Sequence, residues 1–155
     1  MQLNEEVEVL RKVALFSGID PGKLKLLAFT SERVNFAKGQ DLMRQGEVGD
    51  AAYLILNGEA DVFVDAGGGP VKVASAGRNS CVGEMAILRD QPRSATVTAA
   101  TEVATLKITK EGFLQLLEDS PKIAIELMRI LAQRLELTTI DLTGAREKLR
   151  AAGIQ

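Results

Sequence analysis

The sequence contains no histidine and only one cysteine, Cys81, among its 155 residues. The missing histidine removes the commonest general base, the commonest metal ligand and the usual ligand of haem iron. A single cysteine excludes an internal disulfide and any metal or iron–sulfur site that needs several thiolates. Because Cys81 stands in an apolar stretch, we expect a buried, small hydrophobic side chain rather than a redox group. We predict no metal and no cofactor.

Long apolar runs and a large excess of one charge are also missing. No stretch of 18 or more apolar residues occurs, and the acidic first ten residues are unlike a secretory signal, so we predict no membrane segment and a cytoplasmic location. The formal net charge of −2 argues against charge-driven nucleic-acid binding. The hydrophobic content of 46% is too high for disorder, and the length suits one domain over residues 1–155.

The spacing of apolar residues divides the chain into three parts. It is helical over 1–33, has a period of two over 34–109, and is helical again over 110–155. Short strands separated by glycine-rich turns predict an antiparallel β-roll or jelly roll. The predicted fold class is therefore mainly β with flanking α: a β-roll with N-terminal helices, a short internal helix and a long C-terminal helix.

Two turn signals punctuate the predicted β-roll. Asn57-Gly58 lies between apolar runs over 53–56 and 60–64, which predicts a type I′ hairpin. Gly67 to Pro70 predicts a second turn before a strand over 71–74. Further strands are predicted over 93–98 and 102–108.

The flanking helices carry recognisable start signals. In the N-terminal part, helical spacing covers about 4–30, and Asp20 and Pro21 are the predicted cap and first residue of its second helix. The apolar positions of these two N-terminal helices are Val7, Leu10, Val13, Ala14, Leu24, Leu27 and Ala28. In the C-terminal part, a helix over 110–119 is followed by Ser120 as the predicted cap of a long helix. We expect that helix to run to about Thr143 and to kink or stop at Gly144, because glycine disfavours helix.

The long helix has two adjacent apolar stripes. One follows heptad spacing with a polar interruption at Thr138: Ala124, Met128, Leu131, Leu135, Thr138, Leu142, Ala145 and Leu149. The other contains Ile123, Leu127, Ile130 and Leu137. We expect one stripe to pack on the β-roll and the other to meet a partner helix. The alternative is a helix that packs only on its own domain.

The candidate chemistry lies in residues 81–99, CVGEMAILRDQPRSATVTA. Gly83 separates a short strand from a short helix, whose first N–H groups form an anion site, and glycine lets a ligand approach the backbone. Arg93 can hold a phosphate through two parallel hydrogen bonds, and Ser94 adds a hydroxyl donor. Glu84 would repel a bare phosphate but would accept a hydrogen bond from a ribose hydroxyl. Phosphate and ribose together indicate a nucleotide.

This segment resembles the phosphate-binding cassette of cyclic nucleotide-binding domains of the catabolite activator type. The cassette, over 82–97, is matched by Gly83-Glu84, Ala86 and the run from Pro92 to Val97. Upstream, the family's glycines and apolar residues are matched by Gly39, Gly46, Gly49 and Gly58, with Phe36, Leu42, Tyr53 and Ile55 between them. Val82 departs from the family, which usually has an aromatic residue or isoleucine there. The resemblance covers about Phe16 to Leu142.

The resemblance implies a role for each cassette residue. Glu84 would accept the ribose 2′-hydroxyl, and Arg93 would pair with the cyclic phosphate. Backbone N–H groups near Gly83, Met85 and Ala86, with the Ser94 hydroxyl, would complete the phosphate cradle. The alternative is a degenerate cassette in which Glu84 and Arg93 form an ordinary ion pair.

The resemblance also implies a preferred ligand and a dimer. Family members that bind cGMP usually have threonine directly after the cassette arginine, so Ser94 favours cAMP over cGMP. Thr138 and Thr139 stand where relatives of the catabolite activator type hold adenine with one hydroxyl from each subunit of a homodimer. The alternative for these threonines is a solvated helix face.

The implied function is a regulatory module that binds cAMP and signals through its C-terminal helix to a partner protein. Twelve residues follow Thr143, too few for a helix-turn-helix, so we expect no direct DNA binding. No nucleophile elbow, P-loop or metal motif occurs, so we expect no enzymatic activity. Two alternatives stay open: a ligand-free interaction module, and the sensor part of a transcription regulator whose DNA-binding domain lies on another chain or has been removed.

Overall fold

The structure is a computed structural model that describes residues 7–8, 10–13, 16 and 18–153. Residues 7, 8, 10 and 11 are helical, whereas Ala14, a predicted apolar position of that first helix, lies outside the described residues. The further elements, in chain order, are α2 (Pro21–Thr30), β1 (Glu32–Phe36), β2 (Asp41–Met43), β3 (Ala51–Asn57), β4 (Ala60–Asp65), β5 (Pro70–Ala76), β6 (Cys81–Val82), α3 (Glu84–Arg89), β7 (Thr96–Ala99), β8 (Val103–Thr109), α4 (Lys110–Asp119) and α5 (Pro121–Ala151).

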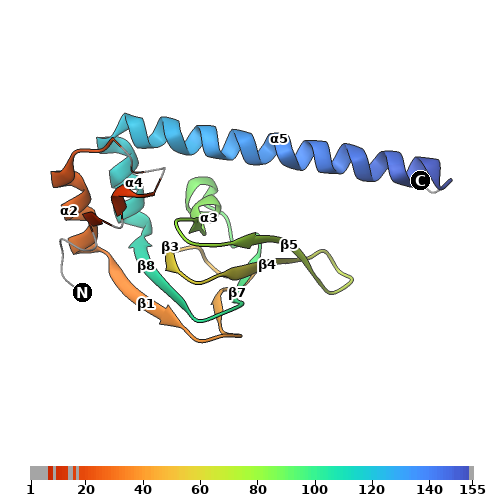
Figure 1. Cartoon of the computed structure of the whole chain (residues 1–155), viewed down its shortest axis with the longest axis horizontal. Coiled ribbons are helices and arrows are strands. Elements are labelled where there is room, and N and C mark those ends of the chain that lie inside the picture. The colour runs from red at the N-terminus through yellow and green to blue at the C-terminus, as the bar shows by residue number, and fades with distance from the viewer. Residues whose placement is uncertain (1–6, 9, 14–15, 17, 154–155) are drawn as a thin grey trace.

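The strands form two four-stranded antiparallel sheets, which confirms the predicted β-roll. One sheet has the order β1-β8-β3-β6 and the other has the order β2-β7-β4-β5. Strands adjacent in the chain therefore often belong to different sheets, as a jelly roll requires. Helices α2 and α4 and the start of α5 gather at one end of the roll (Figure 1).

The hairpin predicted at Asn57-Gly58 is wrong. The flanking strands β3 and β4 lie in different sheets, so the segment is a crossover between the sheets. Only Gly58 has a positive φ, of 93°, whereas a type I′ turn needs two such residues. Gly58 serves a different purpose, because a Cβ there would collide with the carbonyl oxygen of Glu102. Glycine is therefore needed at position 58 for close backbone packing, and not for the pairing of two neighbouring strands.

The turn predicted at Gly67 to Pro70 is confirmed, since β4 and β5 pair in register around it. The strand predicted to begin at Arg93 starts only at Thr96. Arg93 instead pairs its backbone with the loop between β2 and β3: its N–H donates to the carbonyl of Glu47 at 2.7 Å, and its carbonyl accepts from the N–H of Gly46 at 2.9 Å. These bonds hold Arg93 in place before the strand begins.

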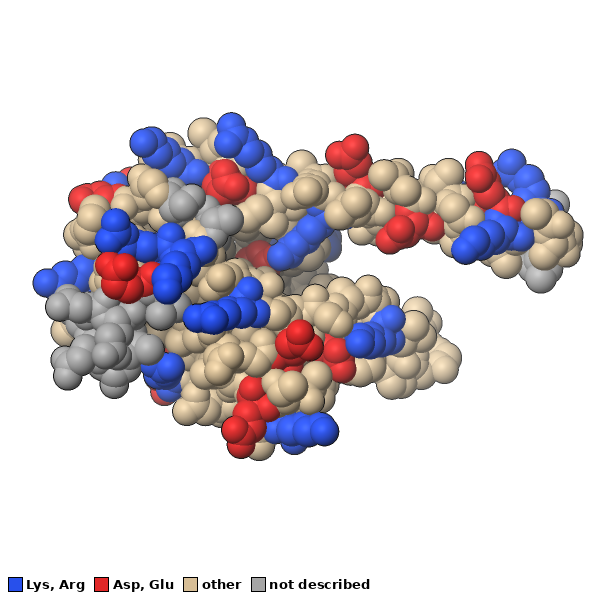
Figure 2. All heavy atoms as spheres, in the orientation of Figure 1, with Lys and Arg blue, Asp and Glu red and all other residues tan. Residues whose placement is uncertain are grey.

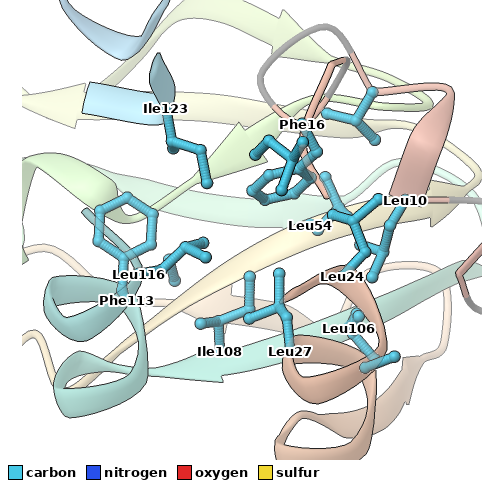
Figure 3. Close-up of a cluster of buried hydrophobic side chains, with 14 of the residues drawn as sticks. Leu10, Phe16, Leu24, Leu27, Leu54, Leu106, Ile108, Phe113, Leu116 and Ile123 are labelled. Atoms are coloured by element: carbon cyan, nitrogen blue, oxygen red, sulfur yellow. The ribbon is translucent and has the colours of Figure 1, made fainter. Parts of the chain in front are cut away.

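Strand β3 lies at the centre of the molecule because both of its faces are buried. On one face, Leu54 joins a cluster with the helices that includes Leu24, Phe113 and Ile123 (Figure 3). On the other face, Ile55 packs between the two sheets. Alternation along a strand sends successive side chains to opposite faces, so this strand connects the helical core with the interior of the roll.

The N-terminal and C-terminal helices match most of the predicted signals. The Asp20 carboxylate accepts from the N–H of Gly22, and Pro21 begins α2. Ser120 is the cap residue of α5, but its side chain makes no capping hydrogen bond. The kink or stop expected at Gly144 is wrong, because α5 continues to Ala151. Among the described residues, no helix combines the length and the apolar character needed to cross a membrane.

A cross-strand pair on the second sheet predicts a pH effect. Asp41 of β2 accepts a 2.7 Å hydrogen bond from the Thr98 hydroxyl of β7, and this bond lowers the pKa of Asp41. A lowered carboxyl pKa stabilises the fold above the unfolded pKa, and this stability is lost as the pH falls through the folded pKa. We expect Thr98→Val to raise the pKa of Asp41 in an NMR titration and to weaken the fall in stability under acid. An unchanged Asp41 pKa would show that the bond is absent in solution.

Candidate ligand-binding site

A cavity of about 410 Å³ lies where the β-roll, α3 and α5 meet. The strands supply mainly apolar lining residues, α3 and the segment after it supply Glu84, Arg93 and Ser94, and α5 contributes Arg134, Leu137 and Thr138. The lining residues are Met43, Val62, Ala74, Ser75, Ala76, Ser80, Cys81, Val82, Gly83, Glu84, Met85, Ala86, Arg93, Ser94, Ala95, Val97, Arg134, Leu137 and Thr138.

Gly83 forms the turn on which the site depends. It caps α3 with a left-handed backbone, φ 89° and ψ 0°, which glycine adopts without strain. A Cβ at this position would lie 2.5 Å from Nη1 of Arg93 and 3.1 Å from the carbonyl oxygen of Ala51. Glycine is therefore required here both by the backbone conformation and by the close approach of the arginine.

The Arg93 guanidinium is buried and oriented by backbone carbonyls. Its Nη1 donates to the Gly83 carbonyl at 3.0 Å, and its Nη2 donates to the Ala51 carbonyl at 2.7 Å. The residue is 5% exposed. A guanidinium has five N–H donors, so these two bonds orient the group and leave three donors for another acceptor.

Glu84 forms an ion pair with the long helix. It lies in the first turn of α3 and is 3% exposed, and its Oε1 accepts a 2.7 Å hydrogen bond from Nη1 of Arg134 on α5. The Arg134 side chain is half exposed. The pair therefore joins a buried carboxylate of the cavity lining to the long helix α5. Glu84 pairs with Arg134, whereas no ion pair between Glu84 and Arg93 occurs in the described structure.

The charged groups favour an anionic ligand that also carries hydroxyls. Two guanidinium groups and one carboxylate line the cavity, which gives it a net positive charge. Ser75, Ser80 and Ser94 also line it. The lining also contains apolar residues, Val62 and Ala74 among them, which suit a flat, weakly polar ring.

The structure brings most of the residues that the sequence singled out to one place. Gly83, Glu84, Met85, Ala86, Arg93, Ser94 and Thr138 all line the cavity. Thr139 does not: successive helix residues point about 100° apart, and its hydroxyl donates to the carbonyl of Leu135 at 2.8 Å. Sequence reasoning missed Arg134. Its position four residues before Thr138 places both on one helix face and could have revealed it.

Cys81 also lines the cavity, beside the charged pair. Burial raises the pKa of its thiol, and the nearby Glu84 carboxylate raises it further. The thiol therefore stays protonated and unreactive at neutral pH. The expected full burial is wrong, because Cys81 is only partly buried, but it does pack against the helical core cluster. Among the described residues, no cluster of three or more acidic or cysteine side chains could hold a metal ion.

Residues 33–120 match the family model of the cyclic nucleotide-binding domain. The match covers more than half of the chain and contains the whole cassette. The fold, the Gly83 turn and the buried Arg93 and Glu84 side chains agree with it. The chain belongs to the cyclic nucleotide-binding domain family.

Known relatives include eukaryotic and bacterial regulators. A cAMP-dependent protein kinase regulatory subunit from Emericella nidulans is 38% identical over 108 residues, 70% of this chain and 26% of that protein. The solved structure of the Thermus thermophilus catabolite activator protein has a TM-score of 0.76 and 29% identity, covering 86% of this chain and 63% of the other. The regulatory subunit of a cAMP-independent protein kinase A from Trypanosoma brucei has a TM-score of 0.76 and 28% identity, covering 84% of this chain and 47% of the other. This chain thus spans less than two thirds of each relative.

Proposed function

We propose that this domain is a receptor for cAMP that signals through α5 to a partner protein and does not degrade its ligand. The observation that carries the proposal is the shared cavity, in which a buried, pre-oriented Arg93 lies with a buried Glu84 that is paired to α5. The Emericella and Thermus relatives, a cAMP-dependent kinase regulator and a catabolite activator, support this ligand class.

Each part of a cyclic nucleotide has a suitable counterpart in the cavity. The phosphate would accept from the remaining Arg93 donors, from the Ser94 hydroxyl and from the first N–H groups of α3, which have no partner within the helix. The ribose 2′-hydroxyl would donate to Glu84. The base would lie against apolar lining residues such as Val62 and Ala74, with Thr138 at its edge. The hydroxyl of Ser94, in place of the threonine usual in cGMP binders, favours adenine over guanine.

The helix α5 is suited to report ligand binding. It is buried on its own domain only at Ile123 and Leu127, and it is joined to the cavity through Arg134. A ribose on Glu84 would share the carboxylate that Arg134 binds, so ligand and helix position are coupled through one group. We propose that the ligand favours the docked helix, and that α5 then pairs in a homodimer or binds an effector.

Calorimetric titration tests the ligand directly. We expect saturable binding of one cAMP per chain, weaker binding of cGMP, and recovery of cAMP unchanged after incubation. No detectable heat from either nucleotide at millimolar concentration would refute the receptor proposal. Conversion of cAMP to AMP would refute the proposal that the ligand is left intact.

A second candidate is a structural module that binds no cyclic nucleotide. It is favoured by the fact that Glu84 and Arg93 both have partners within the chain, so neither charge needs a ligand. The Trypanosoma relative, the regulatory subunit of a cAMP-independent protein kinase A, has the same fold. The titration separates the two candidates, because the structural module would give no heat with either nucleotide.

Hydrogen exchange of residues 121–143 measures the coupling to α5. We expect saturating cAMP to slow exchange there by about 5- to 150-fold, the range of typical allosteric coupling. Arg134→Met keeps the length of the side chain but removes its bond to Glu84, and it should abolish most of this protection. Arg129→Met is the matched control, because Arg129 pairs with Glu126 on α5 and lies outside the cavity. Unchanged exchange in the wild type at saturation would refute the coupling.

A further inference from the structure

The far half of α5 exposes a regular apolar stripe. Figures 1 and 2 show this half standing clear of the β-roll, with a hollow between it and the hairpin of β4 and β5. Along it Leu135 is 68% exposed and Leu142 is 51% exposed, and Met128 and Leu149 continue the row. Soluble proteins rarely leave such a row uncovered, so it indicates an interface.

Thr138 is the single polar residue in this stripe, and it is exposed. The neighbouring threonines, Thr139 and Thr143, donate to carbonyls one helical turn back, at 2.8 and 2.9 Å. Thr138 makes no hydrogen bond to any residue that the structure describes. In a parallel pair of α5 helices aligned in register, the two Thr138 residues would meet each other. In an antiparallel pair Thr138 would face an apolar residue, with its hydroxyl left unpaired.

Two charged residues beside the stripe, Asp141 and Arg146, also favour a parallel pair. With Thr138 at heptad position d and Leu142 at position a, Asp141 occupies position g and Arg146 occupies position e of the next heptad. In a parallel pair, position g of one helix lies beside that position e of the other, whereas an antiparallel pair places g beside g and e beside e. Neither residue forms an ion pair with any described residue of its own chain. Only in the parallel pair would Asp141 of each helix lie beside Arg146 of the other, which gives two such contacts in the dimer.

We propose that Asp141 and Arg146 select a second copy of this chain as the partner of α5 and hold the two helices parallel and in register. The proposal rests on the homodimer of the proposed function and deepens it by naming the residues that set orientation. Neither residue lines the cavity, so the pair acts between the two helices without contacting the ligand. Arg146 and Asp141 act as positioning residues, while the apolar stripe supplies most of the association.

Charge reversal with sedimentation equilibrium tests the proposal on the full chain. Asp141→Arg and Arg146→Asp each turn two attractive contacts into repulsive ones, and each should weaken the dimer at least roughly tenfold. The double variant should return to within about threefold of the wild type. An equimolar mixture of the two single variants should form a heterodimer, since every contact is then attractive. Glu136→Arg and Arg150→Asp, exposed reversals on the same helix away from the stripe, should leave the dimer unchanged.

The outcomes distinguish this inference from the proposed function. If the wild type dimerises but the single reversals dimerise equally well, or the double variant is no better than either, the assigned orientation is wrong. A wild type that stays monomeric with and without cAMP would refute both the homodimer and the inference. Calorimetric titration of the same variants reports separately on the receptor site, and we expect each folded variant still to bind one cAMP per chain.

Discussion

Replacing Arg93 with alanine should weaken cAMP binding by a factor of about 30 or more. Truncating one partner of a buried, charge-assisted pair costs about 2 kcal/mol or more, and tenfold in affinity corresponds to about 1.4 kcal/mol. The guanidinium is also oriented before the ligand arrives, so its loss removes a prepared donor rather than a mobile one. Calorimetry of Arg93→Ala against the wild type measures the change.

The same substitution should also reduce stability, and this effect must be measured separately. It leaves the carbonyls of Gly83 and Ala51 without their partner, and an unsatisfied buried acceptor costs about 1–3 kcal/mol. The thermal stability of each variant is therefore measured alongside its cAMP titration. Arg89→Ala, an exposed arginine in the last turn of α3, is the matched control and should change neither quantity. If folded Arg93→Ala binds cAMP as tightly as the wild type, the phosphate role of Arg93 is wrong.

Gly83→Ala should damage both the fold and the site. An alanine at φ 89° costs about 1–2 kcal/mol in backbone strain. Its Cβ would also displace Arg93, whose Nη1 lies only 2.5 Å from that position. We expect an unfolding free energy lower by about 2–3 kcal/mol and cAMP binding weaker by about tenfold, since the strain and the displaced arginine act together.

Denaturant unfolding and calorimetry measure these two effects. Gly77→Ala is the matched control, because Gly77 has no positive φ and open space surrounds its Cβ position. We expect that control to stay within about 0.5 kcal/mol of the wild type, as is usual for surface substitutions. Wild-type affinity in folded Gly83→Ala would show that the close approach of Arg93 to this turn does not matter for binding.

Local signals explain what the sequence could predict. Helix α4 was expected over 110–119 and spans those residues, because its cap and hydrophobic spacing are both local. The cassette could be found because its glycine, carboxylate and arginine lie within eleven residues. The crossover at Asn57-Gly58 could not be predicted in this way. The sequence around a glycine does not tell whether the following strand pairs with the preceding strand or joins the other sheet.

Long-range contacts account for the rest. The Ala51 carbonyl that orients Arg93 lies 42 residues away along the chain, and Arg134 lies 50 residues from Glu84. Neither contact has a local sequence pattern. Gly144 was misjudged for a related reason: the helix propensities around it outweigh one glycine, and α5 stays intact beyond it.

Because α5 is long, a small tilt near the cavity produces a large displacement at its C-terminal end. Beyond Arg134 the helix continues for about 26 Å, at 1.5 Å per residue, and its anchoring side chains all lie nearer its start. A tilt of about 10° at that pivot would therefore swing the tip by about 4–5 Å, nearly one helical pitch. A displacement of that size can exchange one set of surface contacts for another, although the atoms around the ligand need to move far less.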